Sequence, residues 1–99
     1  MSAQKTTPTA ATLNAVPTPE DIAAASMRRM RFEILDKFGT IKAFHENIHG
    51  IGLEGLKLNL NNKSDMRLAV FYECIAVLGI DQVEFSRRVL RDLEDRQRS

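Results

Sequence analysis

The amino-acid sequence predicts an all-α fold, a small five-helix domain that follows a disordered N-terminal tail. Three observations support this fold class. Apolar residues recur at helical spacing, hydroxyl or acidic residues stand where helix caps belong, and no two segments alternate in the way that paired strands require. We expect the tail to cover residues 1–17 and the helical domain to cover residues 18–96, with residues 39–80 as its core motif.

The composition is typical of one small intracellular domain. The chain has 99 residues, of which 43% are hydrophobic, and it contains no internal repeat. Its single cysteine, Cys74, cannot form an internal disulfide and is expected to be a small buried hydrophobe. We find no signal-peptide pattern and no apolar stretch long enough to cross a membrane, so we expect a cytoplasmic protein. The net charge of +1 neither supports nor excludes binding to nucleic acid.

The first two segments are defined by composition and by a helix start. Residues 1–17 are rich in Thr, Ala, Ser and Pro and have hardly any bulky side chain to bury, so we expect them to be disordered. Thr18 is the predicted N-cap of a helix that runs to about Phe38, because Pro19 and two acidic residues follow it. Gly39 ends this helix, whose apolar face carries Ala23, Met27, Met30, Ile34 and Phe38.

Two short helices are predicted next. Thr40 caps a helix that runs to about His49, and a glycine turn follows. Residues 53–62 fit either a helix or a strand, because one set of leucines has helical spacing while another alternates: Leu53, Leu56 and Leu60 against Leu56, Leu58 and Leu60. We favour the helix, since the neighbouring segments are helical and no second strand is available for pairing.

The most apolar segment runs from Met66 to Leu78. It is apolar nearly all round, which predicts a helix buried by several neighbours. Ser64 or Asp65 is the expected cap of this helix, and Gly79 is the expected left-handed residue after it.

The last predicted helix begins after a cap at Asp81 and should fray from Asp92 onward. Its inward side is expected to carry Val83, Val89, Leu90 and Leu93. Arginines cluster on this helix and on the first one, at Arg28, Arg29, Arg31, Arg87, Arg88, Arg91, Arg96 and Arg98. The default interpretation of both clusters is a solvated helix face.

Three segments together resemble a known family. They are FGTIKAF at the entry to the second helix, LNLNNKSD after the third, and LAVFYECIAVLGI as the packing helix. The stretch from Phe38 to Ile80 resembles the helix-turn-helix domain of Cro and C1-type (XRE-like) phage repressors. Such a resemblance implies a small, repressor-like transcriptional regulator that binds double-stranded DNA, with residues 53–62 in the major groove. We expect a homodimer, because the chain is small and two apolar-faced terminal helices lie outside the helix-turn-helix.

The same resemblance implies a set of DNA-contacting residues: Lys42, Lys57, Leu58, Asn59, Asn61, Asn62 and Lys63. Asparagine suits adenine edges, lysine suits guanine or phosphate, and an exposed leucine suits a thymine methyl group. The alternative interpretation is that these are solvent-facing residues of a small helix and its loop. We expect no catalytic activity, cofactor or metal ion.

A second pattern, HENIH at residues 45–49, matches the H-E-x-x-H motif of zinc metallohydrolases. Two imidazoles one helical turn apart hold the metal in those enzymes, and the glutamate, here Glu46, activates water. Gly52 follows at the spacing of the metzincin motif, but Gly55 stands where that family has its third histidine. Glu73 is another candidate for the third ligand. We interpret the histidines as polar residues beside the helix-turn-helix.

A third class of function stays open. A small helical protein with amphipathic terminal helices can act as a protein–protein interaction module that binds or antagonises a regulator without contacting DNA. The near-neutral charge and the leucine-rich third helix favour this alternative. The salt dependence of duplex binding separates this alternative from the DNA-binding regulator, because binding to DNA phosphates weakens steeply as the salt concentration rises.

Overall fold

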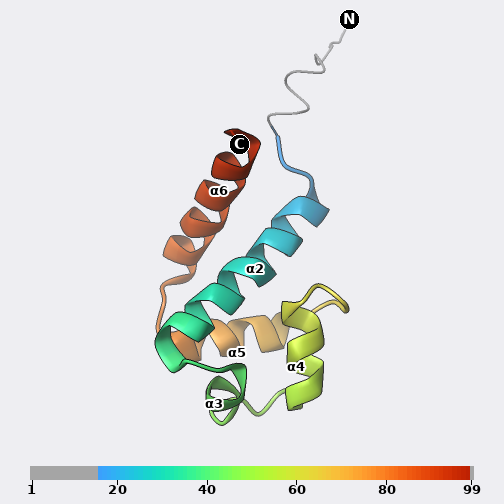
Figure 1. Ribbon diagram of the computed structural model, residues 1–99, viewed down its shortest axis with the longest axis vertical. Helices are drawn as coiled ribbons and strands as arrows, with labels where there is room; N and C mark the ends of the chain where they lie inside the picture. Colours follow the sequence, from blue (N-terminus) through green and yellow to red (C-terminus); the bar gives the residue numbers. More distant parts are fainter. Residues whose placement is uncertain (1–15, 99) are drawn as a thin grey trace, which may run out of the picture.

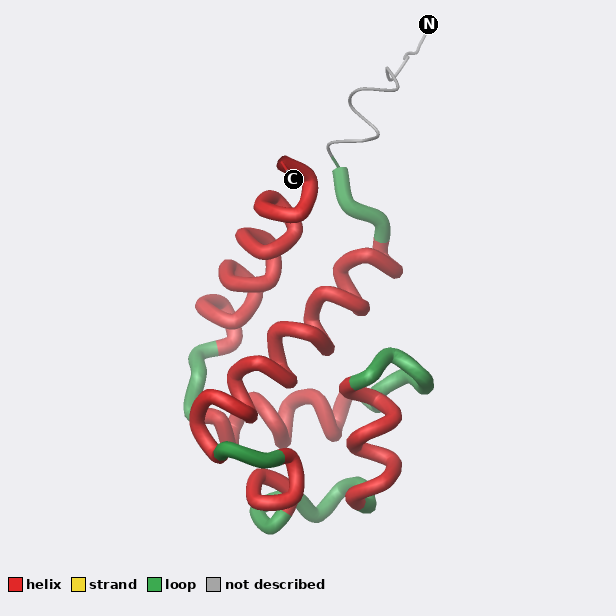
Figure 2. The backbone as a smooth tube through the Cα atoms, in the orientation of Figure 1, coloured by secondary structure: helices red, strands yellow, loops and turns green. Residues whose placement is uncertain are grey.

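The computed structural model describes residues 16–98, and this part of the chain is all-helical, which confirms the predicted fold class. Its five helices are α2 (Pro19–Phe38), α3 (Ile41–His45), α4 (Leu53–Leu60), α5 (Leu68–Leu78) and α6 (Gln82–Arg98), as Figure 1 shows. Figure 2 shows only helices and loops in the same residues. The predicted disorder of the tail falls on residues that, except for 16 and 17, lie outside the described part.

The central element is α2. It packs along α6 on one side and against α3, α4 and α5 on the other. Ion pairs join Arg29 to Asp92 and Arg88 to Glu33, so α6 runs antiparallel to α2. In Figure 1, α3 and α4 lie at the opposite end of the molecule from the C-terminus. None of the described helices has both the length and the apolar character needed to cross a membrane.

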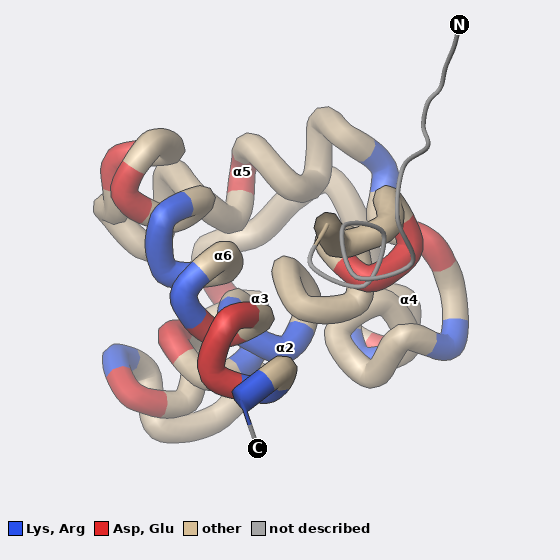
Figure 3. The backbone as a smooth tube through the Cα atoms, turned by 90° about the horizontal axis from the view of Figure 1, so that it is seen from above, with Lys and Arg blue, Asp and Glu red and all other residues tan. Residues whose placement is uncertain are grey.

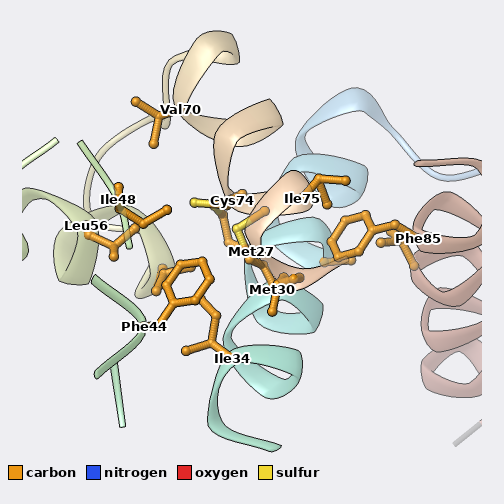
Figure 4. Close-up of a cluster of buried hydrophobic side chains, with 14 of the residues drawn as sticks. Met27, Met30, Ile34, Phe44, Ile48, Leu56, Val70, Cys74, Ile75 and Phe85 are labelled. Carbon is orange, nitrogen blue, oxygen red and sulfur yellow. The ribbon is translucent and has the colours of Figure 1, made fainter. Parts of the chain in front are cut away.

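One hydrophobic core connects all five helices, and Figure 4 shows its central part. The ring of Phe44 is fully buried and lies edge-on to the ring of Phe38, with centroids 5.1 Å apart. Phe85 brings α6 into the same core through an edge contact with Phe71. The fully buried side chains of largest volume are Phe44, Phe85, Met30, Ile34, Leu56, Leu60, Leu78, Val70 and Cys74.

Most of the predicted helix ends are confirmed. Thr18 forms a capping box with Asp21, in which each side chain accepts a hydrogen bond from the backbone amide of the other residue. Thr40 caps α3, and the carboxylate of Asp81 accepts a hydrogen bond from the amide of Glu84 at the start of α6. Gly79 has a φ of 70°, the left-handed conformation predicted after α5.

The predicted length of the second helix is wrong, because α3 ends at His45 rather than near His49. Beyond His45 the chain turns at residues 46 and 47 and then runs without regular structure to Gly52. The amides of Asn47 and Ile48 donate to carbonyl groups three residues back, and those of His49 and Gly50 donate to the carboxylate of Glu73, so none of them continues the α-helical hydrogen-bond pattern.

The predicted cap of the buried helix is also wrong. The N-cap of α5 is Arg67, which makes no side-chain capping bond, and the helix starts at Leu68 rather than Met66. The hydroxyl of Ser64 instead accepts a hydrogen bond from Asn59. Ser64 therefore closes the loop after α4 and does not cap α5.

Burial of α5 on every side is not observed, and one face of α6 is likewise uncovered. Leu68 on α5 is 66% exposed, while Val83 and Leu90 on α6 are 59% and 46% exposed. Ala23, which was expected on the apolar face of α2, is exposed too, and so is Tyr72 on α5. The two helices diverge from the corner at residues 79–81, so neither covers the other's outer face (Figure 1).

The predicted fraying from Asp92 onward is wrong, because α6 continues to Arg98. Asp92 accepts two hydrogen bonds from the guanidinium of Arg29, one of 2.8 Å from Nε. Glu33 on α2 then bridges Arg29 and Arg88. Two arginines of the predicted solvated clusters are therefore part of an ion-pair network that joins α6 to α2.

Candidate nucleic-acid interface

Helix α4 has one buried face and one solvent face. Leu56, Asn59 and Leu60 are buried against the core. The opposite face carries Glu54, Lys57, Leu58 and Asn61, and Leu58 is one of the large apolar side chains that this protein leaves exposed. Lys57 lies 3.6 Å from the carboxylate of Glu54 on the same face. The solvent face thus presents one cation, one anion, an amide and a methyl-rich side chain.

The loop before α4 is held by a carboxylate from α5. Glu73 accepts hydrogen bonds from the backbone amides of His49 and Gly50, at 2.7 and 3.0 Å. A Cβ atom at position 50 would lie only 2.7 Å from Oε1 of Glu73, so any residue other than glycine there would displace the carboxylate from this position. These hydrogen bonds, led by that of His49, favour the charged carboxylate and lower the pKa of Glu73.

The other side of the loop is held by His45. Its ring Nε2 lies 2.7 Å from the carbonyl oxygen of Ile51. A carbonyl oxygen only accepts, so Nε2 carries the proton and donates it. The connection from residue 46 to residue 52 is therefore held by side chains that bind residues 49, 50 and 51, shortly before α4 begins.

The end of α4 is closed by a backbone motif. The amide of Lys63 donates to the carbonyl of Leu58 at 2.8 Å, and the amide of Asn62 donates to the carbonyl of Asn59 at 3.0 Å. Asn62 has a φ of 60°, the left-handed conformation that this Schellman-type ending needs. Its side-chain amide also lies 3.4 Å from the carbonyl oxygen of Ala24 on α2. Asn62 therefore has a structural role at the end of α4.

Asn59 is a correction to the predicted contact residues. It is only 3% exposed, and its Nδ2 donates to the hydroxyl of Ser64 at 2.8 Å. Its Oδ1 is buried and has no hydrogen-bond partner among the described residues. A side chain enclosed in this way cannot reach a base edge, so we remove Asn59 from the set of candidate contacts.

The other predicted residues are accessible. Lys42 on α3 and Lys63 after α4 are exposed, as are Leu58 and Asn61, and Lys57 is partly exposed. The three lysines therefore come from α3, from α4 and from the turn that follows α4. Lysine side chains are among the groups that contact phosphate oxygens in protein–DNA complexes.

The charge around α4 is balanced. Between residues 39 and 80, Lys42, Lys57, Lys63 and Arg67 are matched by Glu46, Glu54, Asp65 and Glu73. Figure 3 shows basic and acidic positions interspersed over the described chain. Any attraction to a polyanion therefore depends on the local arrangement of a few lysines rather than on a broad basic surface.

The zinc motif does not assemble. Because α3 ends at His45, His49 is not on the same helix, and the two imidazoles do not share one helical face. Glu73 binds the loop amides, and no three His, Cys, Asp or Glu side chains between residues 16 and 98 are grouped so that they could hold a metal ion.

Burial raises the pKa of the Cys74 thiol to about 12, so this residue is the inert buried cysteine that the sequence predicts.

Two residues that shape this region were given other roles by the sequence. Glu73 was considered only as a metal ligand, and Ser64 only as a helix cap. Glu73 binds backbone amides more than 20 residues earlier in the chain, and Ser64 binds Asn59 across a loop. A periodic sequence pattern does not indicate contacts of this kind. For the contact of Glu73, the sequence offers one signal: a glycine at position 50 combined with a long acidic side chain on the helix that packs nearby.

Comparisons with known proteins give no assignment: no family model, no curated protein and no solved structure matches this chain.

Proposed function

We propose that this protein is a small DNA-binding transcriptional regulator that places α4 in the major groove and acts as a homodimer. The observation that carries the proposal is the solvent face of α4, which presents Lys57, Leu58 and Asn61 from a short helix held by contacts with its neighbours. An α-helix of this kind fits the major groove, where lysine, leucine and asparagine each have suitable partners on base edges.

The lysines outside α4 support the same proposal. Lys42 and Lys63 flank the helix in the chain and are exposed, which suits contacts to the phosphates on either side of a groove. Lys57 is the candidate for guanine or phosphate, Asn61 for adenine and Leu58 for a thymine methyl group. Glu54 on the same face opposes binding, because its carboxylate repels phosphates.

Titration of a labelled mixed-sequence duplex with the full chain tests the proposal. We expect binding at low salt that weakens steeply toward physiological salt, because lysine–phosphate contacts release counterions. A variant with Lys42, Lys57 and Lys63 all changed to alanine should lose this binding while keeping its helical circular dichroism. No binding of the wild-type chain at low salt would refute the proposal.

A second function is favoured by a different observation, the balance of charge together with exposed apolar side chains. Leu58, Leu68 and Val83 are exposed on three different helices. A protein–protein interaction module that binds or antagonises a regulator would need no basic surface and would use such side chains. It predicts no binding to the duplex at any salt and loss of a protein partner when Leu58 is changed to a charged residue.

A further inference from the structure

An apolar groove opens between α2, α5 and α6. It has a volume of about 270 Å³ and is lined by Ile22, Ser26, Phe71, Phe85, Val89 and Leu90. A wider recess of about 530 Å³ adjoins it and shares Ser26 and Phe71, and Leu68 and Met66 also line this recess. No helix of the described chain covers this surface, which is unusual for a contiguous apolar area.

Beside the groove lies a ridge on α6, formed by Val83 and Leu90. These residues are two helical turns apart, so they point the same way, and both are exposed. Leu90 also lines the groove, so ridge and groove are neighbours on one face of the molecule. The surface therefore contains both a projecting apolar element and a recess of apolar character.

Such a surface can complement itself. In an interface with two-fold symmetry the same patch is used by both copies, and every contact occurs twice. A two-fold axis along the boundary between the ridge and the groove, nearly parallel to α6, brings the ridge of each copy onto the groove of the other. In Figure 1 α6 runs lengthwise and α4 lies near the other end, so such an axis leaves both α4 helices at the same end of the pair.

Charges at the edge of this surface fit the same arrangement. Glu20 and Asp65 lie on the rim of the wider recess. Arg87 stands four residues after Val83 and three before Leu90, with Arg91 one turn further, so both arginines flank the ridge. The guanidinium of Arg87 also lies 3.9 Å from the carboxylate of Glu84 on its own helix. In a pair in which the ridge of one copy enters the groove of the other, we expect these arginines to face the acidic residues of the recess. Polar, complementary charges around an apolar centre are typical of protein interfaces.

We propose that two copies of this chain pair by inserting the α6 ridge of each into the groove between α2, α5 and α6 of the other. The inference deepens the proposed function, since it names the surface of the dimer on which that proposal rests. The pairing gives each of the two α4 helices a fixed position relative to the other.

Sedimentation equilibrium of the full chain at micromolar concentrations tests the pairing. We expect a dimer, and Leu90→Glu should raise its dissociation constant by at least about 30-fold, the effect of losing one interface hot spot. The matched control is Phe32→Glu, because Phe32 is 57% exposed on α2 and borders a recess on the other side of α6. This control should dimerise like the wild type, and circular dichroism should show both variants folded.

A charge exchange tests the orientation. Arg87→Glu should weaken the dimer several-fold, and adding Asp65→Arg in the same chain should restore it, because each copy then supplies both exchanged partners. A chain that stays monomeric up to millimolar concentration would overturn the inference. So would a dimer that Leu90→Glu leaves intact, or one that the charge exchange does not restore.

The outcome is separable from that of the proposed function. Sedimentation is measured without DNA, and duplex binding is measured independently. A dimer that binds no duplex would refute the regulator and leave the pairing supported. A monomer that binds duplex through α4 would overturn the pairing alone.

Discussion

Replacing Lys57 by alanine should change the salt dependence of DNA binding by a predictable amount. Three accessible lysines, Lys42, Lys57 and Lys63, are available to each copy for phosphate contacts. The logarithm of the binding constant falls with the logarithm of salt concentration with a slope of about −0.9 for each neutralised phosphate. Six lysines in a dimer therefore give a slope of about −5, and the four that remain in the variant give about −3.6.

These slopes correspond to large differences in affinity. Between about 50 and about 200 mM salt, the wild-type dimer should lose on the order of 10³-fold in affinity and the Lys57→Ala dimer only about 10²-fold. Fluorescence anisotropy of a labelled duplex at four or more salt concentrations measures both values. The matched control is Arg28→Ala, which removes an exposed positive charge from α2 beside α6, where no DNA contact is proposed.

Two results would contradict this reasoning. If Lys57→Ala and wild type gave the same slope, Lys57 would make no phosphate contact, and the count of six phosphate-binding lysines would be wrong. If Arg28→Ala lowered the slope as much as Lys57→Ala, the attraction would be a property of the whole molecule rather than of α4.

Three further substitutions give distinct expectations. Glu54→Ala should tighten duplex binding at low salt several-fold, because it removes a repulsive charge and releases Lys57 from its partner 3.6 Å away. Unchanged affinity in the same anisotropy assay would argue against groove contact by α4. Asn59→Ala should lower the free energy of unfolding by about 1 kcal/mol, measured in urea, without altering the salt slope, because its bond to Ser64 is internal. Glu73 has a lowered pKa, so the stability it adds is complete above its ordinary pKa of 4.5 and is lost as the pH falls through the lowered value. Thermal melts from pH 6 down to pH 2 should therefore show a smaller acid-induced loss for Glu73→Gln than for wild type, and parallel curves would contradict the contact.

Local signals made most of the helices predictable. The capping residues Thr18 and Thr40 and the left-handed Gly79 act within a few residues of their own position, so their effect can be read from neighbouring letters. Helical spacing of leucines also identified α4 correctly, against the competing strand pattern. Boundaries set by nearby residues are those that a sequence alone can specify.

Features that depend on distant residues were not predictable. The early end of α3 depends on Glu73 and Ile51, and the continuation of α6 past Asp92 depends on Arg29, which is far away in the chain. The divergence of α5 from α6 decides which apolar side chains stay exposed. The angle between the two helices cannot be predicted from the hydrophobic periodicity of either one. For the same reason the burial of Asn59 could not be distinguished from exposure, because a polar residue on a short helix is usually solvated.

The contact of Glu73 with the loop makes the position of α4 dependent on a part of the chain that follows it. A peptide containing only α3, the loop and α4 would lack the carboxylate that binds the amides of His49 and Gly50, and it would also lack the core beneath Leu56. Transplanting α4 into another scaffold would therefore transfer its amino-acid sequence without its orientation relative to the rest of the domain. Under the proposed function, changes in DNA preference should accordingly arise from substitutions in α5 that never touch a base, as well as from those on the face of α4.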